Sequence, residues 1–230
     1  MPSWLLSDTP TVVGIYDVLA QSDKGSTLML HALLSFDEGR PAVTKTTDVK
    51  CVHMGPPFGT HHYQCHAAGS AMLSNEERRK IKTFVGRRLK EREAERARLR
   101  RAAREREIRA EYCILPSPQK PTRAFPLWRF SCVGFALQAY RTAHIELLGS
   151  PLPLRTLDDL KRFYPYAAAK LDDPQMRKLW GIASGDSWPV SLVGYVLHSL
   201  NREPADIRAM PYIPQPGDEH FPRTELYSTR

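Results

Sequence analysis

The most constraining feature of this 230-residue chain is the uneven distribution of its charge. Residues 76–111 contain 15 Lys or Arg and 8 Glu, a net charge of +7, whereas the whole chain carries +8. The other 194 residues are therefore nearly neutral, with a net charge of +1. Such a stretch is too charged to be buried, and its Glu and Arg residues at helical spacing favour a long helix with a solvated face.

The beginning of this charged segment carries a helix signal of its own. Ser74 is followed three residues later by Glu77, which is the spacing of a capping box. Ile81 and Leu89 then fall on one face of the helix. We expect a helix over residues 74–111, inserted between a sheet and later helices. Its first turns should pack on the core, and its second half should project into solvent or contact a partner.

The residues before the charged helix favour strands. β-branched and other apolar residues dominate three segments that are separated by turn-forming residues, namely 12–19, 27–36 and 42–52. The simplest arrangement is an antiparallel meander of three strands. Residues 55–70, which are rich in Gly, Pro and His, are expected to form a loop.

The residues after the charged helix favour short helices. Four prolines from Pro116 to Pro126 indicate an extended linker. Helical segments are expected at 131–148, from Thr156, from Asp172 and at 187–200. Four more prolines indicate an extended tail over residues 206–230. The chain is therefore predicted to be one α+β domain over residues 1–230, a small antiparallel sheet with packed helices plus one long charged helix.

Composition also bounds the environment of the chain. No apolar run approaches the roughly 20 residues that a membrane-spanning helix needs, and the first residues do not resemble an export signal. Four cysteines in a chain of this length do not form a disulfide framework. We expect a cytoplasmic protein with reduced thiols, without a membrane span and without a cofactor.

The segment Phe130-Ser-Cys-Val-Gly-Phe135 is the most informative for chemistry. It delivers Cys132 to the N-terminus of a predicted helix, where free N–H groups and the helix dipole favour a thiolate and lower the pKa of a cysteine. Those N–H groups can also stabilise an oxyanion. Ala136, Ala139 and Ala143 share a face with Cys132, so the helix can approach a sheet closely.

This segment resembles the cysteine helix of the NlpC-type peptidases, in the papain-like superfamily. Cys132, Gly134, Phe135 and the pair Ala139–Tyr140 agree with that pattern, whereas Ser131 and Val133 depart from it. Upstream, residues 30–36 (Leu-His-Ala-Leu-Leu-Ser-Phe) are similar to the strand that carries the family's histidine. A histidine strand before a cysteine helix is the order of the permuted branch, which includes lecithin retinol acyltransferase-like proteins and permuted bacterial amidases.

The resemblance implies a permuted papain-like fold and a hydrolase or acyltransferase that acts on an amide or ester. Cys132 would be the nucleophile and His31 the base of a covalent acyl-enzyme mechanism. The third, orienting residue should lie on the adjacent strand, where the turn at 37–40 places Thr46 opposite His31 and Asp48 on the same face, with His53 further along. The sequence does not choose among these three.

A purely structural interpretation competes with catalysis. A cysteine on an alanine-rich helix face usually serves packing, and a histidine in an apolar strand usually bonds to the backbone of the core. Metal binding is a further alternative. Zinc's preferred ligand types occur at Cys51, His53, Cys65 and His66. Their spacing matches no common zinc motif, so we predict a loop without metal.

The charged helix supports a second, unrelated function. A basic segment at 76–111 is suited to nucleic acid or to a protein partner, in which case the chain would be a non-catalytic binding protein. The competing interpretation is a solvated or coiled-coil face, because the basic residues are interleaved with glutamates and few aromatic residues are nearby for base stacking.

Overall fold

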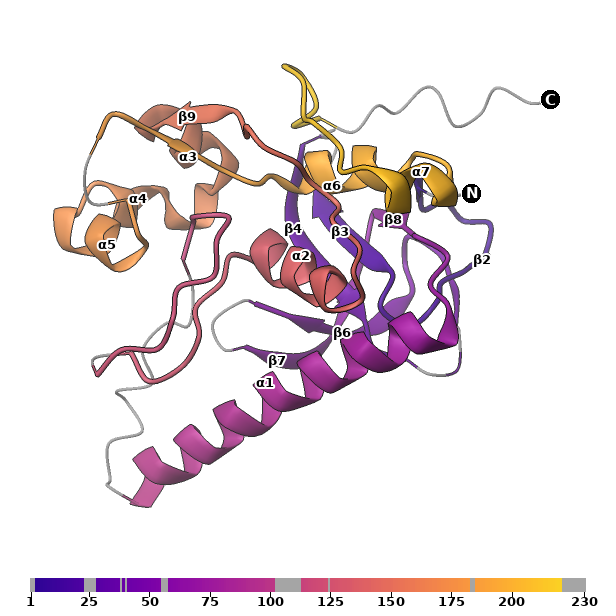
Figure 1. Ribbon diagram of the computed structural model, residues 1–230, viewed down its shortest axis with the longest axis horizontal. Coiled ribbons are helices and arrows are strands. Elements are labelled where there is room, and N and C mark those ends of the chain that lie inside the picture. The colour runs from indigo at the N-terminus through magenta and orange to yellow at the C-terminus, as the bar shows by residue number, and fades with distance from the viewer. Residues whose placement is uncertain are drawn as a thin grey trace.

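The computed structural model describes residues 3–22, 28–37, 39, 41–54, 58–101, 113–123, 125–182 and 185–220. It confirms the α+β class, because helices pack on a central antiparallel sheet (Figure 1). Strands dominate the first third of the chain and helices the remainder, as the residue patterns predict.

The main sheet has six strands, and every neighbouring pair runs antiparallel. Their order across the sheet is β1 (Ser3–Leu5), β8 (Ala67–Gly69), β3 (Val18–Ser22), β4 (Met29–Ser35), β6 (Asp48–His53) and β7 (Gly59–Gln64). The predicted meander corresponds to the neighbouring strands β3, β4 and β6, but its first strand is shifted from residues 12–19 to Val18–Ser22. The loop predicted over residues 55–70 is wrong in its described part, because β7 pairs along the whole of β6 and β8 pairs with both β1 and β3.

The register of the meander also differs from the prediction. After the turn, the chain first forms β5 (Ala42–Val43), which pairs with β2 (Thr11–Val12) outside the main sheet. The Thr44 amide then donates a hydrogen bond to Thr47 Oγ1 at 2.9 Å, closing a tight turn before β6 begins. As a result Ser35 faces Cys51, and it is the end of β6, rather than Thr46, that approaches His31.

The two faces of the sheet carry separate apolar clusters. Ala32, Leu34 and Val52 belong to the large cluster on the side of the helices. Leu33 and Val49 belong to a smaller cluster on the other side, together with Leu6, Val13, Leu19, Val43, Cys51, Cys65 and Ala68. Adjacent strand residues point to opposite faces, so this partition follows the period of two in the sequence.

Helix α1 (Asn75–Arg101) begins at the predicted capping box. The Ser74 amide donates to Glu77 Oε2 at 2.6 Å, and the Glu77 amide donates to Ser74 Oγ at 3.2 Å. Ile81 and Val85 are fully buried, and the first half of the helix packs on α2. The second half projects from the body of the molecule (Figure 1). The predicted continuation over residues 102–111 lies outside the described residues.

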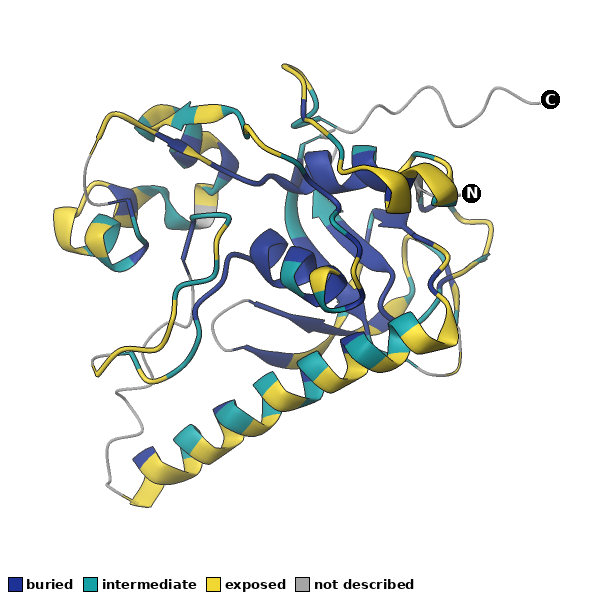
Figure 2. Cartoon of the chain, viewed as in Figure 1, coloured by how far each residue is buried: buried dark blue, intermediate teal, exposed yellow. Residues whose placement is uncertain are grey.

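Helix α2 (Cys132–Thr142) crosses β4 and fills the centre of the molecule. Figure 2 shows that it is almost entirely buried, in contrast to α1. The remaining elements form the periphery and follow in the order β9 (Leu154–Thr156), α3 (Leu157–Phe163), η2 (Pro165–Ala167), α4 (Ala168–Leu171), α5 (Pro174–Leu179), β10 (Ser187–Pro189), α6 (Val193–Leu200) and α7 (Pro204–Ala209).

Helix starts in this half are predicted better than helix lengths. Thr156 caps α3 with a complete capping box, and Asp173 caps α5. Residues 187–189 form a short strand instead of the first turn of a helix, because β10 pairs with β9. The tail from residue 206 is also not wholly extended, because α7 reaches Ala209, and residues 221–230 lie outside the described residues. None of the helices within the described ranges has both the length and the apolar character needed to cross a bilayer.

Candidate active site around Cys132 and His31

Cys132 occupies the first position of α2, as the sequence predicts. Ser131 is the N-cap residue, and its hydroxyl accepts a hydrogen bond from the Gly134 amide at 2.8 Å. A Cβ at Gly134 would lie 2.9 Å from Ser131 Oγ and 3.3 Å from the carbonyl oxygen of Pro116. The glycine therefore lets the cap close and the linker lie against the helix, which fixes the position of the thiol.

The small residues of α2 bring the cysteine to the histidine strand. Ala136 and Ala139 are fully buried and belong to the same core cluster as Ala32 of β4. The Cys132 thiol interacts with the backbone N–H of Ala32, the residue that follows His31. Cys132 therefore contacts the backbone of β4 from the side of the helices. The His31 ring lies on the other face of the sheet with His53 and Tyr63, because Ala32, the next residue, points to the helix side and neighbouring strand residues alternate. No hydrogen bond joins the His31 ring to the thiol among the described residues.

The ring of His31 is held by a chain of hydrogen bonds across the sheet. Its Nε2 lies 2.9 Å from His53 Nδ1, and the two rings meet edge to face with centroids 5.0 Å apart. His53 Nε2 in turn lies 2.9 Å from the Tyr63 hydroxyl. Because Nε2 of His31 is engaged, Nδ1 is the nitrogen that is left for a reacting group.

The protons of the hydrogen-bonded residues His31, His53 and Tyr63 can be arranged in two ways. If Tyr63 donates to His53 Nε2, then His53 Nδ1–H donates to His31 Nε2, and His31 carries its proton on Nδ1. If instead His53 Nε2–H donates to the tyrosine oxygen, His53 Nδ1 accepts from His31 Nε2–H, and the lone pair of His31 Nδ1 is available. Only the second arrangement makes His31 a base.

Burial keeps all members of the site neutral. It lowers the pKa of His31 to about 4. The pKa of His53 falls to about 3, through burial first and then through the nearby His31 and His61. Burial also raises the pKa of the Cys132 thiol, and the N–H groups of Ala32 and Val133 oppose this only in part. The expectation that the helix N-terminus lowers this pKa is therefore wrong, since Cys132 is only 3% exposed and desolvation outweighs the helix dipole.

Of the three candidates for the orienting residue, the structure brings only His53 to His31. Asp48 begins β6 and pairs with Gln64, five residues from His53 along the strand. Thr46 lies in the turn before it, where its hydroxyl is 3.1 Å from Thr44 Oγ1. Sequence reasoning missed Tyr63, because it treated residues 55–70 as a loop. The alternation of Gly59, His61 and Tyr63 on one face of β7 is the signal that could have found it.

The cysteine and histidine residues considered for zinc are occupied in other ways. The Cys51 thiol bonds to the Val49 carbonyl at 3.3 Å and lies against Cys65. His66 Nδ1 accepts a hydrogen bond from the Ser22 amide at 3.0 Å. Within the described part of the chain, no three His, Cys, Asp or Glu residues are arranged to hold a metal ion. His31, His53 and His61 form a row, with His53 between the other two, rather than a ring around one point.

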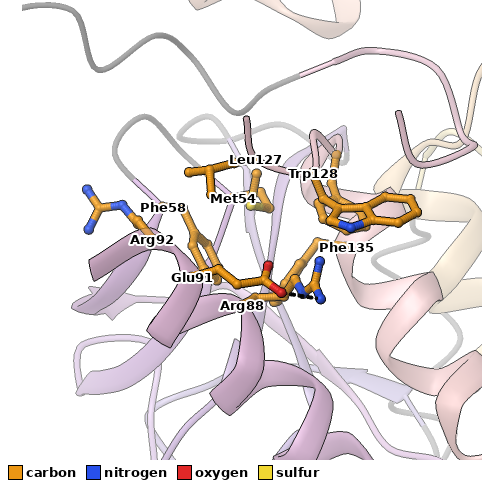
Figure 3. A pocket seen from close by; sticks show the side chains of 9 residues that line it. Met54, Phe58, Arg88, Glu91, Arg92, Leu127, Trp128 and Phe135 are labelled. Atoms are coloured by element: carbon orange, nitrogen blue, oxygen red, sulfur yellow. Dashed lines mark hydrogen bonds and ion pairs between the residues drawn. The ribbon is translucent and has the colours of Figure 1, made fainter. Parts of the chain in front are cut away.

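Aromatic residues fill the space between α1 and α2. Phe135 of α2 packs on Phe58, with ring centroids 5.1 Å apart, and also on Phe84 of α1 and on Phe130. The cavity left between them and Arg88 is about 10 Å³, room for about one water (Figure 3).

Comparison with known proteins adds no relative to these observations. No family model, no curated protein and no solved structure matches the chain.

Proposed function

We propose that the protein is a cysteine-dependent hydrolase or acyltransferase that acts on an amide or ester. The observation that carries the proposal is the Cys132 thiol at the first position of α2, against the N–H of Ala32 in the strand that also carries His31. Nucleophilic catalysis needs a base at this thiol, and for His31 to be that base its ring has to reach the helix side of β4, because it is bonded to His53 on the other face.

The reaction follows from the protonation states. Both Cys132 and His31 are neutral at rest, so, with the His31 ring on the helix side of β4, the thiol proton passes to this imidazole as the sulfur bonds to the substrate carbonyl carbon. The electron pair of the C=O bond moves to the oxygen, and the N–H groups of Cys132 and Val133 at the start of α2 stabilise the resulting anion, since the Gly134 N–H already donates to Ser131. His31 then gives its proton to the leaving amine or alcohol, which departs and leaves a thioester on Cys132.

The second half of the cycle reverses these roles. Water, or another alcohol or amine, gives its proton to His31 and attacks the thioester carbonyl. The Cys132 sulfur leaves and recovers the proton. Water as the acceptor makes the reaction a hydrolysis, and an amine or alcohol makes it an acyl transfer.

The test is transient acylation by an activated ester. Mixing the protein with p-nitrophenyl acetate should release a burst of nitrophenolate equal to one per chain, and mass spectrometry should find the acetyl group on the peptide that contains Cys132. Cys132→Ser should abolish the burst, whereas Cys113→Ser, the matched control at another buried thiol, should keep it. Acetylation of another cysteine, or no burst at all, would refute the proposal.

A further inference from the structure

The outer face of α1 is exposed from Arg79 to Arg101 and is mostly basic. From residue 79 onward the exposed residues are Arg79, Lys82, Thr83, Arg87, Lys90, Glu93, Ala94, Ala97, Arg98, Arg100 and Arg101. Seven of these eleven are basic and one is acidic. In Figure 2 this surface is the yellow side of the projecting helix.

Most glutamates of α1 are paired away from this face. Glu91 bonds to Arg88 at 2.8 Å, and Glu77 bonds to Arg208 of α7 at 2.9 Å. Glu95 is the exception among these pairs, because it binds Arg98 of the outer face at 2.7 Å. Arg79, Arg87 and Lys90 have no ion pair within the described part of the chain, and all three point outward. Charge interleaved in the sequence is thus separated by the fold into a mixed flank and a positive outer face.

The outer face lacks the apolar residues that protein and membrane interfaces require. Its uncharged members are Thr83, Ala94 and Ala97, in addition to the half-buried Gly86. Stable protein interfaces need buried aromatic or aliphatic anchors, and helices that bind membranes insert an apolar face. A surface of this kind gains its binding energy from charge alone.

The shape of the face matches a regular array of phosphates. Arg79 and Arg101 lie 22 residues apart on one continuous helix, which is about 33 Å at 1.5 Å per residue. A nucleic-acid duplex carries one negative charge per roughly 1.7 Å of its axis, so a rigid rod of this length spans about one helical turn of phosphates. No aromatic residue lies on the outer face to stack with bases, which single-strand binding requires.

We propose that the outer face of α1 docks on the phosphate backbone of double-stranded nucleic acid, independently of base sequence. The proposal is independent of the acyl chemistry at Cys132, because it rests on exposed charge outside the core. Counterion release supplies the binding energy, so the affinity should fall linearly with salt on a logarithmic plot.

The test compares two variants that lose the same charge. Arg79→Gln/Arg87→Gln/Lys90→Gln removes three positive charges from the outer face. Arg123→Gln/Lys170→Gln/Lys178→Gln removes three exposed ones elsewhere. Binding to a fluorescent DNA duplex of about two turns (roughly 20 bp) is measured by anisotropy from low to moderate salt. We expect the first variant to lose most of the affinity, with the magnitude of its logarithmic salt slope reduced by about 2.7, at 0.9 per lost contact. The second variant should keep the wild-type slope.

Other ligands distinguish the alternatives. Equal losses in the two variants would mean attraction to net charge, and the outer face would not be the site. If a single strand of the same length binds more tightly than the duplex, the proposal that the face binds double-stranded nucleic acid is wrong. Polyglutamate binding as tightly as duplex, or retention on phosphatidylserine vesicles without duplex binding, would assign the face to acidic protein or to membrane. Circular dichroism of both variants confirms that the helix is retained, because Gln has a helix propensity close to that of Arg and Lys.

Discussion

The hydrogen-bonded chain of His31, His53 and Tyr63 and the outer face of α1 use basic side chains in opposite ways. Among the hydrogen-bonded histidines, burial removes charge and leaves both imidazoles neutral. On the outer face of α1, the Arg and Lys side chains are exposed to solvent. The fold separates a site suited to proton transfer from a surface suited to long-range attraction, although both consist of basic residues.

The largest effect is expected where the proton is transferred. His31→Ala should lower the rate of Cys132 acetylation by about 10²- to 10⁴-fold, since that is the usual contribution of a general base. The rate is measured by stopped-flow release of nitrophenolate. His62→Ala on the exposed side of β7 is the matched control and should keep the wild-type rate. If both variants react like the wild type, His31 is not the base.

The two sides of α1 should differ clearly in their effect on stability. Ile81 is fully buried, so Ile81→Ala should lower the free energy of unfolding by about 2–5 kcal/mol. Thr83→Ala, two residues away on the outer face, should change it by less than about 0.5 kcal/mol. Urea unfolding followed by circular dichroism measures both. Similar losses in the two variants would mean that the outer face is buried against something in solution.

Acid should destabilise the fold through the histidines. Burial holds the pKa of His31 at about 4 in the folded chain, below its ordinary value of 6.5, so the unfolded chain takes up the proton first as the pH falls. Stability is constant above about pH 6.5 and decreases from there to about pH 4, by up to about 3 kcal/mol from this residue. His53 acts in the same direction. Urea unfolding at pH 7 and pH 4.5 should show a smaller difference for His31→Gln than for wild type; an equal difference would locate the acid sensitivity elsewhere.

The sequence predicts the local features of both regions and misses their long-range pairing. The capping box at Ser74 and the helix starts at Thr156 and Cys132 depend on neighbouring residues, and all three are confirmed. Which residue becomes the hydrogen-bond partner of His31 depends on how many residues lie between β4 and β6. The unexpected strand β5 shifts that register, so His53 is selected over Asp48 only by the fold. Burial decided the pKa of Cys132, and burial cannot be read from one helix alone.

The smallest expected effect is at Tyr63, and it tests which way the protons of the chain are arranged. If the tyrosine oxygen accepts from His53 Nε2–H, then Tyr63→Phe removes the acceptor that keeps His31 Nδ1 unprotonated. The acetylation rate should then fall by about 3- to 10-fold, which corresponds to the roughly 0.5–1.5 kcal/mol net value of one hydrogen bond. Tyr212→Phe, whose hydroxyl bonds to Asp218 away from the sheet, is the matched control and should leave the rate unchanged. The unfolding free energy of both variants is measured in parallel, so that a loss of stability is not mistaken for a loss of base. A rate that rises in Tyr63→Phe would mean that the tyrosine donates to His53 in the resting protein and holds His31 in the arrangement that is not a base.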